Sequence, residues 1–501
     1  MIELNFVDNF IIISYLVFTL IIGLIFSVHK EQNSLDYFLA GRNLKWYMVG
    51  ISLFASSISG GYLIAATGFE ISSSYLVSHA EMLTVIFFLL LCAYFGPKYI
   101  KANVFSTSEF LEKRFDRNSR IYVALFQVLT NIFIRITVIL FAGGLILKQV
   151  LDWDTFTTTL VLVLLSGLYS VVGGLKAVIY TQIVQTVFLF SAVILLGVYG
   201  LHAAGWISGL LSQPTFGSVF FLKPTFLPNL PLLGIVLGVP IIGFWYWCTD
   251  QTIIQRILSA KSITDAKRGA YLAILLKIIF ISSIAVIGLL TIKLSLENKS
   301  DQSFSLIVSN GIFPSGVKGI FIIGIFSLIM SSLSSLFNST SALLTMDFYR
   351  MAYPNASQRK LVLVGRLSTT FTVLLVILCV PLIKYLNADN YKYIQNSLAF
   401  ISAPVAALFI LGFFFKKMNS KGAILGLIIG GSLGLFRITI DLLVNFFSFS
   451  NFFLSWVLEI NFLYFTIFIF ITSLITMLFI SSLKPIIETR ELNINRIDAW
   501  K

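Results

Sequence analysis

Hydroxyl side chains and paired glycines interrupt an otherwise apolar stretch at residues 51–68. They take positions where a membrane helix normally carries Leu or Ile, at Ser56, Ser57, Ser59, Gly60 and Gly61. Serine and glycine weaken a helix locally, and at membrane depth an unwound backbone persists only where protein or a watery cavity satisfies its polar groups. The freed carbonyl oxygens of such a break can bind a cation, and a half-helix N-terminus can bind a solute. The alternative is a close helix contact built from small residues.

A second polar stretch covers residues 327–347. Four of its side chains fall within helical reach of one another, and Ser332 lies beside them: Ser331, Ser334, Ser335 and Asn338. This density of hydroxyl groups exceeds what a helix contact needs, although Ser and Thr also bond the carbonyls of their own helix. Both stretches therefore predict a binding site inside a bundle of helices.

The composition predicts a protein with many membrane spans. Of 501 residues, 57% are hydrophobic and only 11% are charged, with a mean hydropathy of +0.93, and no soluble core absorbs that much apolar surface. The net charge of +13 comes from short Lys and Arg clusters between apolar spans, which indicate topology and not a nucleic-acid partner. The three cysteines lie in separate spans without metal or disulfide spacing: Cys92, Cys248 and Cys379. We expect the apolar run at 10–28 to be a retained helix, because no basic segment precedes it.

Charged and Pro/Gly-rich connections divide the chain into about thirteen spans of the length that a bilayer requires. Their approximate limits are 8–28, 46–70, 75–97, 119–150, 156–173, 177–202, 230–256, 267–296, 317–349, 361–384, 391–414, 420–443 and 458–482. Lys and Arg concentrate in alternate connections, near 98–120, 256–268, 350–366 and 416–421. Because basic loops stay in the cytoplasm, we expect the N-terminus outside and the C-terminus inside.

The seventh span is also interrupted. In GFWYWCTDQ, at residues 243–251, an aromatic cluster is followed by a polar end. If spans two to six and seven to eleven are two five-helix repeats of opposite topology, this interruption corresponds to the one in the second span. The predicted units are an extra helix and inner loop (1–45), a first repeat (46–202), an outer loop (203–229), a second repeat (230–414), and two further helices with a cytoplasmic tail (415–501).

Several motifs occur in order over residues 36–421. They are DYFLAGR (36–42), STSEFLEKRF (106–115), Gln251 with IIQR (253–256), NST (338–340), TMD (345–347), YIQ (393–395) and SKGA (420–423). On these motifs the chain resembles the sodium/solute symporter family, and most closely its bacterial sodium/sugar branch. The resemblance implies an all-α polytopic protein of the bacterial inner membrane, with a leucine-transporter-like core of two inverted five-helix repeats.

The resemblance also implies a sodium site between the first and eighth core helices. Carried onto this sequence, its ligands are the carbonyls of Ala55, Ile58 and Leu328 and the hydroxyls of Ser331 and Ser332. Five hard, neutral oxygens suit a small cation that must be released again. The family usually has an acid near this site in the fifth core helix, where this chain has Gln182. An amide supports the serines by hydrogen bonds but adds no negative charge to hold the ion.

For the solute, the resemblance implies contacts from Glu81, Lys277 and Gln395, with Tyr246 as the inner gate and Trp247 beside it. Ionisable groups in apolar spans are costly, which makes the first two functional candidates. The alternative is that they form a structural ion pair.

Three solute-contact positions depart from the sugar branch. Ser57 and Gly243 stand where that branch has Asn, and Tyr62 stands where it has Gln. A site that hydrogen-bonds hydroxyl groups discriminates strongly against solutes that leave its groups unpaired. We therefore expect a solute other than galactose or glucose.

Arg135 is a further departure, since this position is neutral in the sugar branch. It resembles the arginine with which the sialic-acid branch holds its substrate carboxylate, and a guanidinium fork suits a planar carboxylate. Counting Arg135 and Lys277 against Glu81 leaves one excess positive charge, which an anionic solute would neutralise. The alternative is that Arg135 pairs with Glu81.

We expect a sodium-driven symporter that imports a monosaccharide or sugar acid by alternating access. Its partners are then sodium, the solute and the lipid bilayer. Other candidates are a symporter for another organic anion or an amino acid (sialic acid, proline or pantothenate type), and a weakly coupled sensor or leak channel, which Gln182 favours. An enzyme is disfavoured, because no nucleophile, base and orienting group share a site and the histidines are scattered at His29, His79 and His202.

Overall fold

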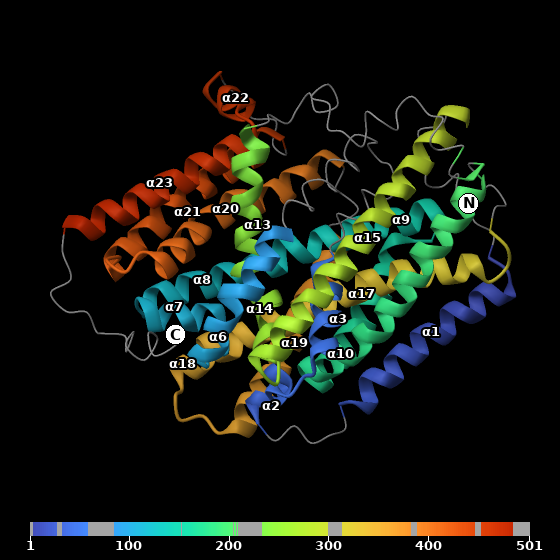
Figure 1. Cartoon of the computed structure of the whole chain (residues 1–501), viewed down its shortest axis with the longest axis horizontal. Coiled ribbons are helices and arrows are strands. Elements are labelled where there is room, and N and C mark those ends of the chain that lie inside the picture. Colours follow the sequence, from blue (N-terminus) through green and yellow to red (C-terminus); the bar gives the residue numbers. More distant parts are fainter. Residues whose placement is uncertain are drawn as a thin grey trace.

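The computed structural model describes residues 4–27, 33–58, 85–151, 153–203, 205, 206, 208, 233–298, 313–381, 388–445 and 452–483. This part of the chain is built from helices (Figure 1), nine of them long and apolar enough to cross a membrane. The predicted class, an all-α polytopic membrane protein, is confirmed. The expected number of about thirteen spans stays a prediction, since several of the predicted spans extend beyond these residues.

The described helices occur along the chain in the following order. Their bounds are α1 (Phe6–Ile25), α2 (Ser34–Leu39), η1 (Ala40–Arg42), α3 (Trp46–Ser57), η2 (Leu91–Phe95), α6 (Gly96–Ala102), α7 (Thr107–Arg114), α8 (Arg117–Leu129), η3 (Thr130–Arg135), α9 (Ile136–Leu151), α10 (Thr155–Ala203), η5 (Gly234–Gly238), α13 (Val239–Cys248), α14 (Gln251–Leu258), α15 (Ile263–Asn298), α17 (Val317–Leu343), η6 (Leu344–Tyr349), α18 (Arg350–Ala352), α19 (Gln358–Cys379), α20 (Ala388–Phe414), α21 (Ser420–Asn445), α22 (Phe452–Glu459) and α23 (Phe462–Leu483).

Helix α17 lies at the centre of the bundle. It packs against α10, α1, α3, α9 and α19. Within its most apolar window, 94% of the residues are buried, against 28% for α1 at the periphery. The polar stretch predicted from residues 327–347 therefore lies inside the protein, where its hydroxyl groups must find protein partners or ligands.

Helix α10 contains two antiparallel arms. Gly174 has φ +52° and ψ −149°, outside the helical region. The Gln185 side-chain amide donates to the hydroxyl of Tyr169 over 3.5 Å, whereas 16 residues of straight helix would separate these positions by about 24 Å. The chain therefore folds back at this glycine, and α10 comprises the two spans predicted at 156–173 and 177–202.

The last helices form a layer of their own at one side of the bundle. Helices α20, α21 and α23 pack against one another, and α22 packs against α21 (Figure 1). Arg437 of α21 donates to the carbonyls of Leu458 and Ile460, over 3.3 and 3.2 Å, and forms an ion pair with Asp441 at 3.3 Å. Its guanidinium thus joins α21 to the end of α22.

A charged cluster fixes the end of the bundle that carries α6, α7 and α18. The Asp347 carboxylate accepts from the Ser106 hydroxyl and from the Arg120 guanidinium, each over 2.7 Å. Arg120 also pairs with Glu112 and donates to the carbonyl of Met346 over 2.7 Å. Two of the motifs found in the sequence, STSEFLEKRF and TMD, therefore serve to hold α7, α8 and η6 together.

Candidate functional site

Helix α3 ends where the serines of the second span begin. Its last helical residue is Ser57, and Ile58 is extended, with φ −89° and ψ 120°. The part of the predicted interruption that lies within the described residues, the end of the helix, is confirmed. Ser59, Gly60 and Gly61 lie outside the described residues, as do the next 23 positions up to residue 84.

The end of α3 leaves four successive carbonyls without helical partners, as at any helix C-terminus. Two of them accept from serines of α17: the carbonyl of Ala55 from Ser331, and that of Ile58 from Ser332. The carbonyls of Ser56 and Ser57, which lie between these two, both accept from the Tyr246 hydroxyl over 3.4 Å. The carbonyls at 55–58 therefore join α3 to α17 on one side and to α13 on the other.

The five predicted sodium ligands lie together between α3 and α17. The Ser331 hydroxyl is 3.5 Å from the carbonyl oxygen of Ala55 and 3.0 Å from that of Leu328. The Ser332 hydroxyl is 2.8 Å from the carbonyl oxygen of Ile58. All five residues are buried. That these five oxygens bind sodium stays a prediction.

Gln182 of α10 lies directly behind these ligands. Its amide oxygen accepts from the Ser52 hydroxyl over 2.6 Å. Its amide nitrogen donates to the Ser335 hydroxyl over 2.7 Å, with the Ser331 carbonyl at 3.2 Å and the Ser56 hydroxyl at 3.3 Å. The amide thus holds α3 and α17 in register, and its support of a bound ion stays a prediction.

The second predicted interruption lies between α13 and α14 and is likewise confirmed. Helix α13 ends at Cys248, and Asp250 is extended before α14 begins. The Cys248 carbonyl accepts from the Tyr99 hydroxyl over 2.9 Å, and the Thr249 carbonyl accepts from the Gln127 amide over 3.3 Å. The freed backbone at this break is satisfied by side chains from two other helices, as burial in a membrane protein requires.

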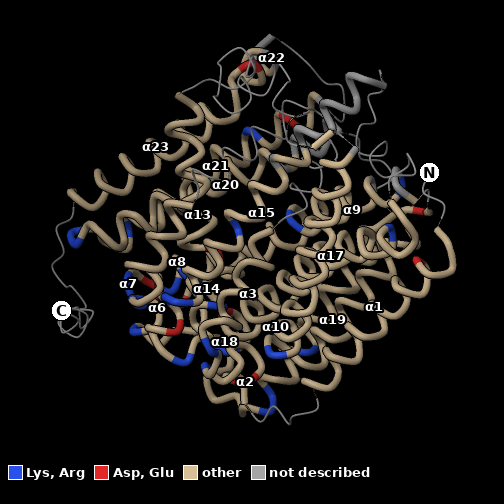
Figure 2. Tube along the Cα trace, turned by 45° about the vertical axis from the view of Figure 1, so that its right-hand side comes forward, with Lys and Arg blue, Asp and Glu red and all other residues tan. Residues whose placement is uncertain are grey.

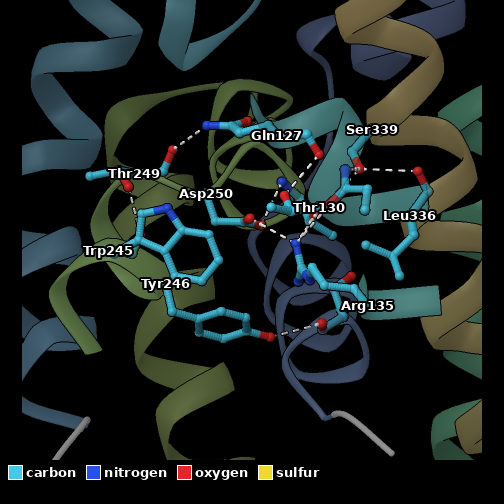
Figure 3. A network of polar contacts seen from close by, with 12 residues as sticks. Gln127, Thr130, Arg135, Trp245, Tyr246, Thr249, Asp250, Leu336 and Ser339 are labelled. Carbon is cyan, nitrogen blue, oxygen red and sulfur yellow. Dashed lines mark hydrogen bonds and ion pairs between the residues drawn. The ribbon is translucent and has the colours of Figure 1, made fainter. Parts of the chain in front are cut away.

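Arg135 and Asp250 form an ion pair across this break (Figure 3). A guanidinium nitrogen lies 2.7 Å from the carboxylate, and the same nitrogen donates to Asn131 over 3.1 Å and to Thr252 over 3.3 Å. Arg135 is the last residue of the π-helical turn η3, a distortion that often occurs at functional sites. Both side chains are almost fully buried, so the pair neutralises two charges that would otherwise be costly.

Tyr246, Trp247 and Lys277 form a cluster beside this pair. The Arg135 guanidinium carbon lies 5.5 Å from the centre of the Tyr246 ring, and the Lys277 ammonium lies 4.1 Å from the Trp247 ring. Phe88 stacks on Trp247 at 4.3 Å. These contacts combine π-face attraction for cations with apolar packing. The structure thus brings together the predicted gate, its neighbouring Trp and the buried lysine.

The remaining predicted solute contacts are described only in part. Ser57 is buried, and its hydroxyl donates to the carbonyl of Phe54 over 2.8 Å. Gln395 lies within α20, but its side chain is not among those described, and Tyr62 and Glu81 lie outside the described residues. The predicted alternative, a pair of Arg135 with Glu81, stays a prediction.

Sequence reasoning missed Asp250, Asn131 and Ser339. The Asn131 amide nitrogen lies 3.4 Å from the Ser339 hydroxyl, and that hydroxyl lies 3.1 Å from the hydroxyl of Thr252. The acid itself was visible, at the polar end of the interrupted seventh span. The earlier count of charges in the cavity omitted this acid, whose negative charge offsets that of Arg135.

Comparison with known proteins identifies the family. The model of the sodium:solute symporter family matches residues 37–430. The sodium/glucose cotransporter 1 of Oryctolagus cuniculus is 30% identical over 530 residues, covering 96% of this chain and 80% of that protein. The sodium/myo-inositol cotransporter 2 of Mus musculus is 33% identical over 473 residues, covering 87% of this chain and 70% of that protein. The chain therefore belongs to the sodium:solute symporter family.

The fold agrees with this assignment. A Na+-coupled sialic acid symporter in a substrate-bound outward-open state superposes with a TM-score of 0.82 at 22% identity, over 96% of this chain and 99% of that one. A manganese transporter of Eremococcus coleocola gives a TM-score of 0.53 at 14% identity. The protein is thus a multi-pass membrane protein with the leucine-transporter-like fold, and it couples solute transport to sodium.

Proposed function

We propose that this protein imports a neutral polyhydroxylated solute, a monosaccharide or a cyclic polyol, together with sodium. The observation that carries the proposal is the ion pair of Arg135 and Asp250 at 2.7 Å. Because the guanidinium already has a carboxylate partner, the site needs no anionic solute to neutralise it. The named functions of the relatives, transport of glucose and of myo-inositol, point to the same class of solute.

A sugar acid remains the second candidate, favoured by the position of Arg135. The guanidinium is 5.5 Å from the ring of the proposed gate Tyr246, where a solute carboxylate would be within reach. Such a solute would compete with Asp250 for the charge of the guanidinium, whose hydrogen bonds to Asn131, Asp250 and Thr252 all use one nitrogen. The two candidates therefore differ in what Asp250 does, as a permanent partner of the arginine or as a competitor of the solute.

Sodium binding would couple to the gate through the end of α3. The carbonyls of Ala55 and Ile58 are proposed to share the ion with Ser331 and Ser332, while the carbonyls between them contact Tyr246. An ion that draws α3 onto α17 would therefore fix the same peptide groups that contact the proposed gate. The sodium gradient and membrane potential would drive uptake, the potential supplying roughly 2.3 kcal/mol per charge per 100 mV.

The proposed location is the inner membrane of a bacterium, with the N-terminus outside and the C-terminus in the cytoplasm. Lys and Arg gather around α2, α6, α7, α14 and α18 at one end of the bundle (Figure 2). Basic residues that collect at one end of a membrane bundle support a cytoplasmic position for that end.

The test is a thermal-shift screen of the purified protein, with and without sodium, since a ligand that binds the native state raises the melting temperature. We expect stabilisation by neutral hexoses or inositols that requires sodium, and none by hexuronates or sialic acids. Sodium-dependent stabilisation by an acidic sugar alone would overturn the proposal in favour of the second candidate.

The variant Asp250→Asn separates the two candidates further. If Asp250 is the permanent partner, the variant leaves a buried guanidinium unpaired and lowers both the melting temperature and uptake of the neutral solute. If Asp250 competes with the solute, the variant frees the guanidinium and raises affinity for an acidic sugar. Arg135→Gln serves as the matched control, because it removes the other half of the pair.

A further inference from the structure

The N-terminal helix α1 carries a buried carboxylate that caps two helices. Asp8 is fully buried. One of its oxygens accepts from the backbone N–H of Asn5 and so caps α1 itself. The other accepts from the backbone N–H groups of Gly316 and Gly319, over 2.8 and 2.9 Å, at the start of α17.

Helix α17 has no cap of its own at this end. Its N-cap residue is Gly316, with φ +87° and no side chain that could accept from the first turn. The first N–H groups of a helix lack internal partners, and the helix dipole adds positive potential there, so a carboxylate is the most favourable group to meet them. Asp8 supplies from another helix what α17 lacks.

The two helices are built to approach each other at this point. A side chain at Gly319 would place its Cβ 3.0 Å from the Cα and carbonyl oxygen of Asp8, so a larger residue would push α1 away. Two turns deeper, the Tyr15 hydroxyl bonds the Ser327 hydroxyl over 2.7 Å. Two buried polar contacts, several residues apart, therefore fix α1 and α17 against sliding along each other.

We propose that Asp8 is a positioning residue for sodium: it fixes the axial position of α17 and thereby the geometry of the ion site. This inference rests on the sodium site proposed above. Ser327 directly precedes the proposed ligand Leu328, whereas Gly319 lies nine residues before it, about 14 Å along the helix. Asp8 therefore does not touch the ion. Without it, the hydroxyls of α17 are held less firmly against the carbonyls of α3, and the site must be assembled at the moment of binding.

The experiment measures sodium-dependent uptake and the sodium-dependent rise in melting temperature for Asp8→Ala and Asp8→Asn. Loss of the cap should raise the half-saturating sodium concentration roughly fivefold in Asp8→Ala. Asp8→Asn keeps an acceptor oxygen and should give a smaller shift. Solute affinity at saturating sodium should stay unchanged in both variants.

The matched control is Asp154→Ala. Asp154 caps the N-terminus of its own helix, α10, accepting from the backbone N–H of Thr157 over 2.8 Å, and we expect it on the same membrane side as Asp8. Its loss should leave sodium dependence unchanged. If Asp8→Ala does not yield folded protein, Tyr15→Phe carries the test, because it removes only the contact with Ser327 and should shift sodium dependence in the same direction.

Two results would overturn the proposal. The first is that Asp8→Ala lowers the melting temperature equally with and without sodium and leaves the half-saturating sodium concentration unchanged. Asp8 would then be a purely structural residue. The second is that the half-saturating sodium concentration rises as much in Asp154→Ala as in Asp8→Ala. Failure of the sodium site itself is recognised separately, since Ser332→Ala would then also leave sodium dependence unchanged.

Discussion

Ser332 is the residue that joins the two halves of the proposed sodium site most directly. Its hydroxyl donates across the helix interface to the carbonyl of Ile58 over 2.8 Å, whereas the hydroxyl of Ser331 lies closer to the carbonyl of Leu328, in its own helix. When an ion binds, the hydroxyl oxygens become ligands and their protons must turn away from the carbonyls. In the proposed site, the serines would therefore hold α3 and α17 together before the ion binds and would share the ion with the same carbonyls afterwards.

Ser332→Ala should raise the half-saturating sodium concentration about tenfold, which corresponds to the loss of one charge-assisted contact of about 1.4 kcal/mol. The measurement is solute uptake as a function of sodium concentration. The matched control is Ser341→Ala, which also removes a buried contact from α17, to the carbonyl of Gly365 over 2.7 Å, but away from the site. Equal sodium dependence in the two variants would remove Ser332 from the site.

For individual residues, the sequence allowed the polar side chains of the site to be predicted, but not the residues with which they pair. The serines and the buried lysine were recognisable because they are polar groups in apolar spans. The pairing of Arg135 with Asp250 was not, since it joins positions 115 residues apart, and the chain offered a second acid in an apolar span, Glu81. Only the packing of η3 against the break between α13 and α14 brings Asp250 to the guanidinium.

Among the elements, breaks that depend on local composition were predictable. The end of α3 follows from serines and glycines, and the break before α14 follows from the polar residues after an aromatic cluster. The course of α10 was harder to foresee, because a single glycine takes the place of a loop between two spans. Gly174 has a backbone conformation that other residues adopt only with strain.

Gly174→Ala should lower the melting temperature and the amount of folded protein. A Cβ at this position would lie 2.5 Å from the carbonyl oxygen of Tyr37, and the backbone strain alone costs about 1 to 3 kcal/mol. Gly197→Ala is the control, because that glycine lies in the same helix with nothing within 4 Å of its Cβ and should be neutral or slightly stabilising. Equal melting temperatures would show that the turn tolerates a side chain.

For the whole molecule, the distribution of charge sets the expected orientation. The segment around Lys417 lies at the basic end of the bundle, because Arg114 of α7 donates to the carbonyls of Phe415 and Lys416 over 3.0 and 3.4 Å. Helix α22 lies at the opposite end (Figure 1). Both Lys417 and Glu459, the last residue of α22, are exposed. A single introduced cysteine at either position should therefore react with a reagent in water.

In a chain whose three cysteines are replaced by alanine, Glu459→Cys should react with a membrane-impermeant maleimide added to intact cells. Lys417→Cys should react only after the membrane is opened. The reason is the retention of basic segments in the cytoplasm. The reverse pattern of labelling would invert the proposed topology.

The four carbonyls at the end of α3 have a consequence for how such a transporter can evolve. They are main-chain atoms, so substitutions that preserve the backbone path leave them in place. The solute contacts proposed here, such as Lys277 and Arg135, are side chains and can be exchanged one at a time. A lineage that inherits this helix end can therefore acquire a new cargo while it keeps the same driving ion.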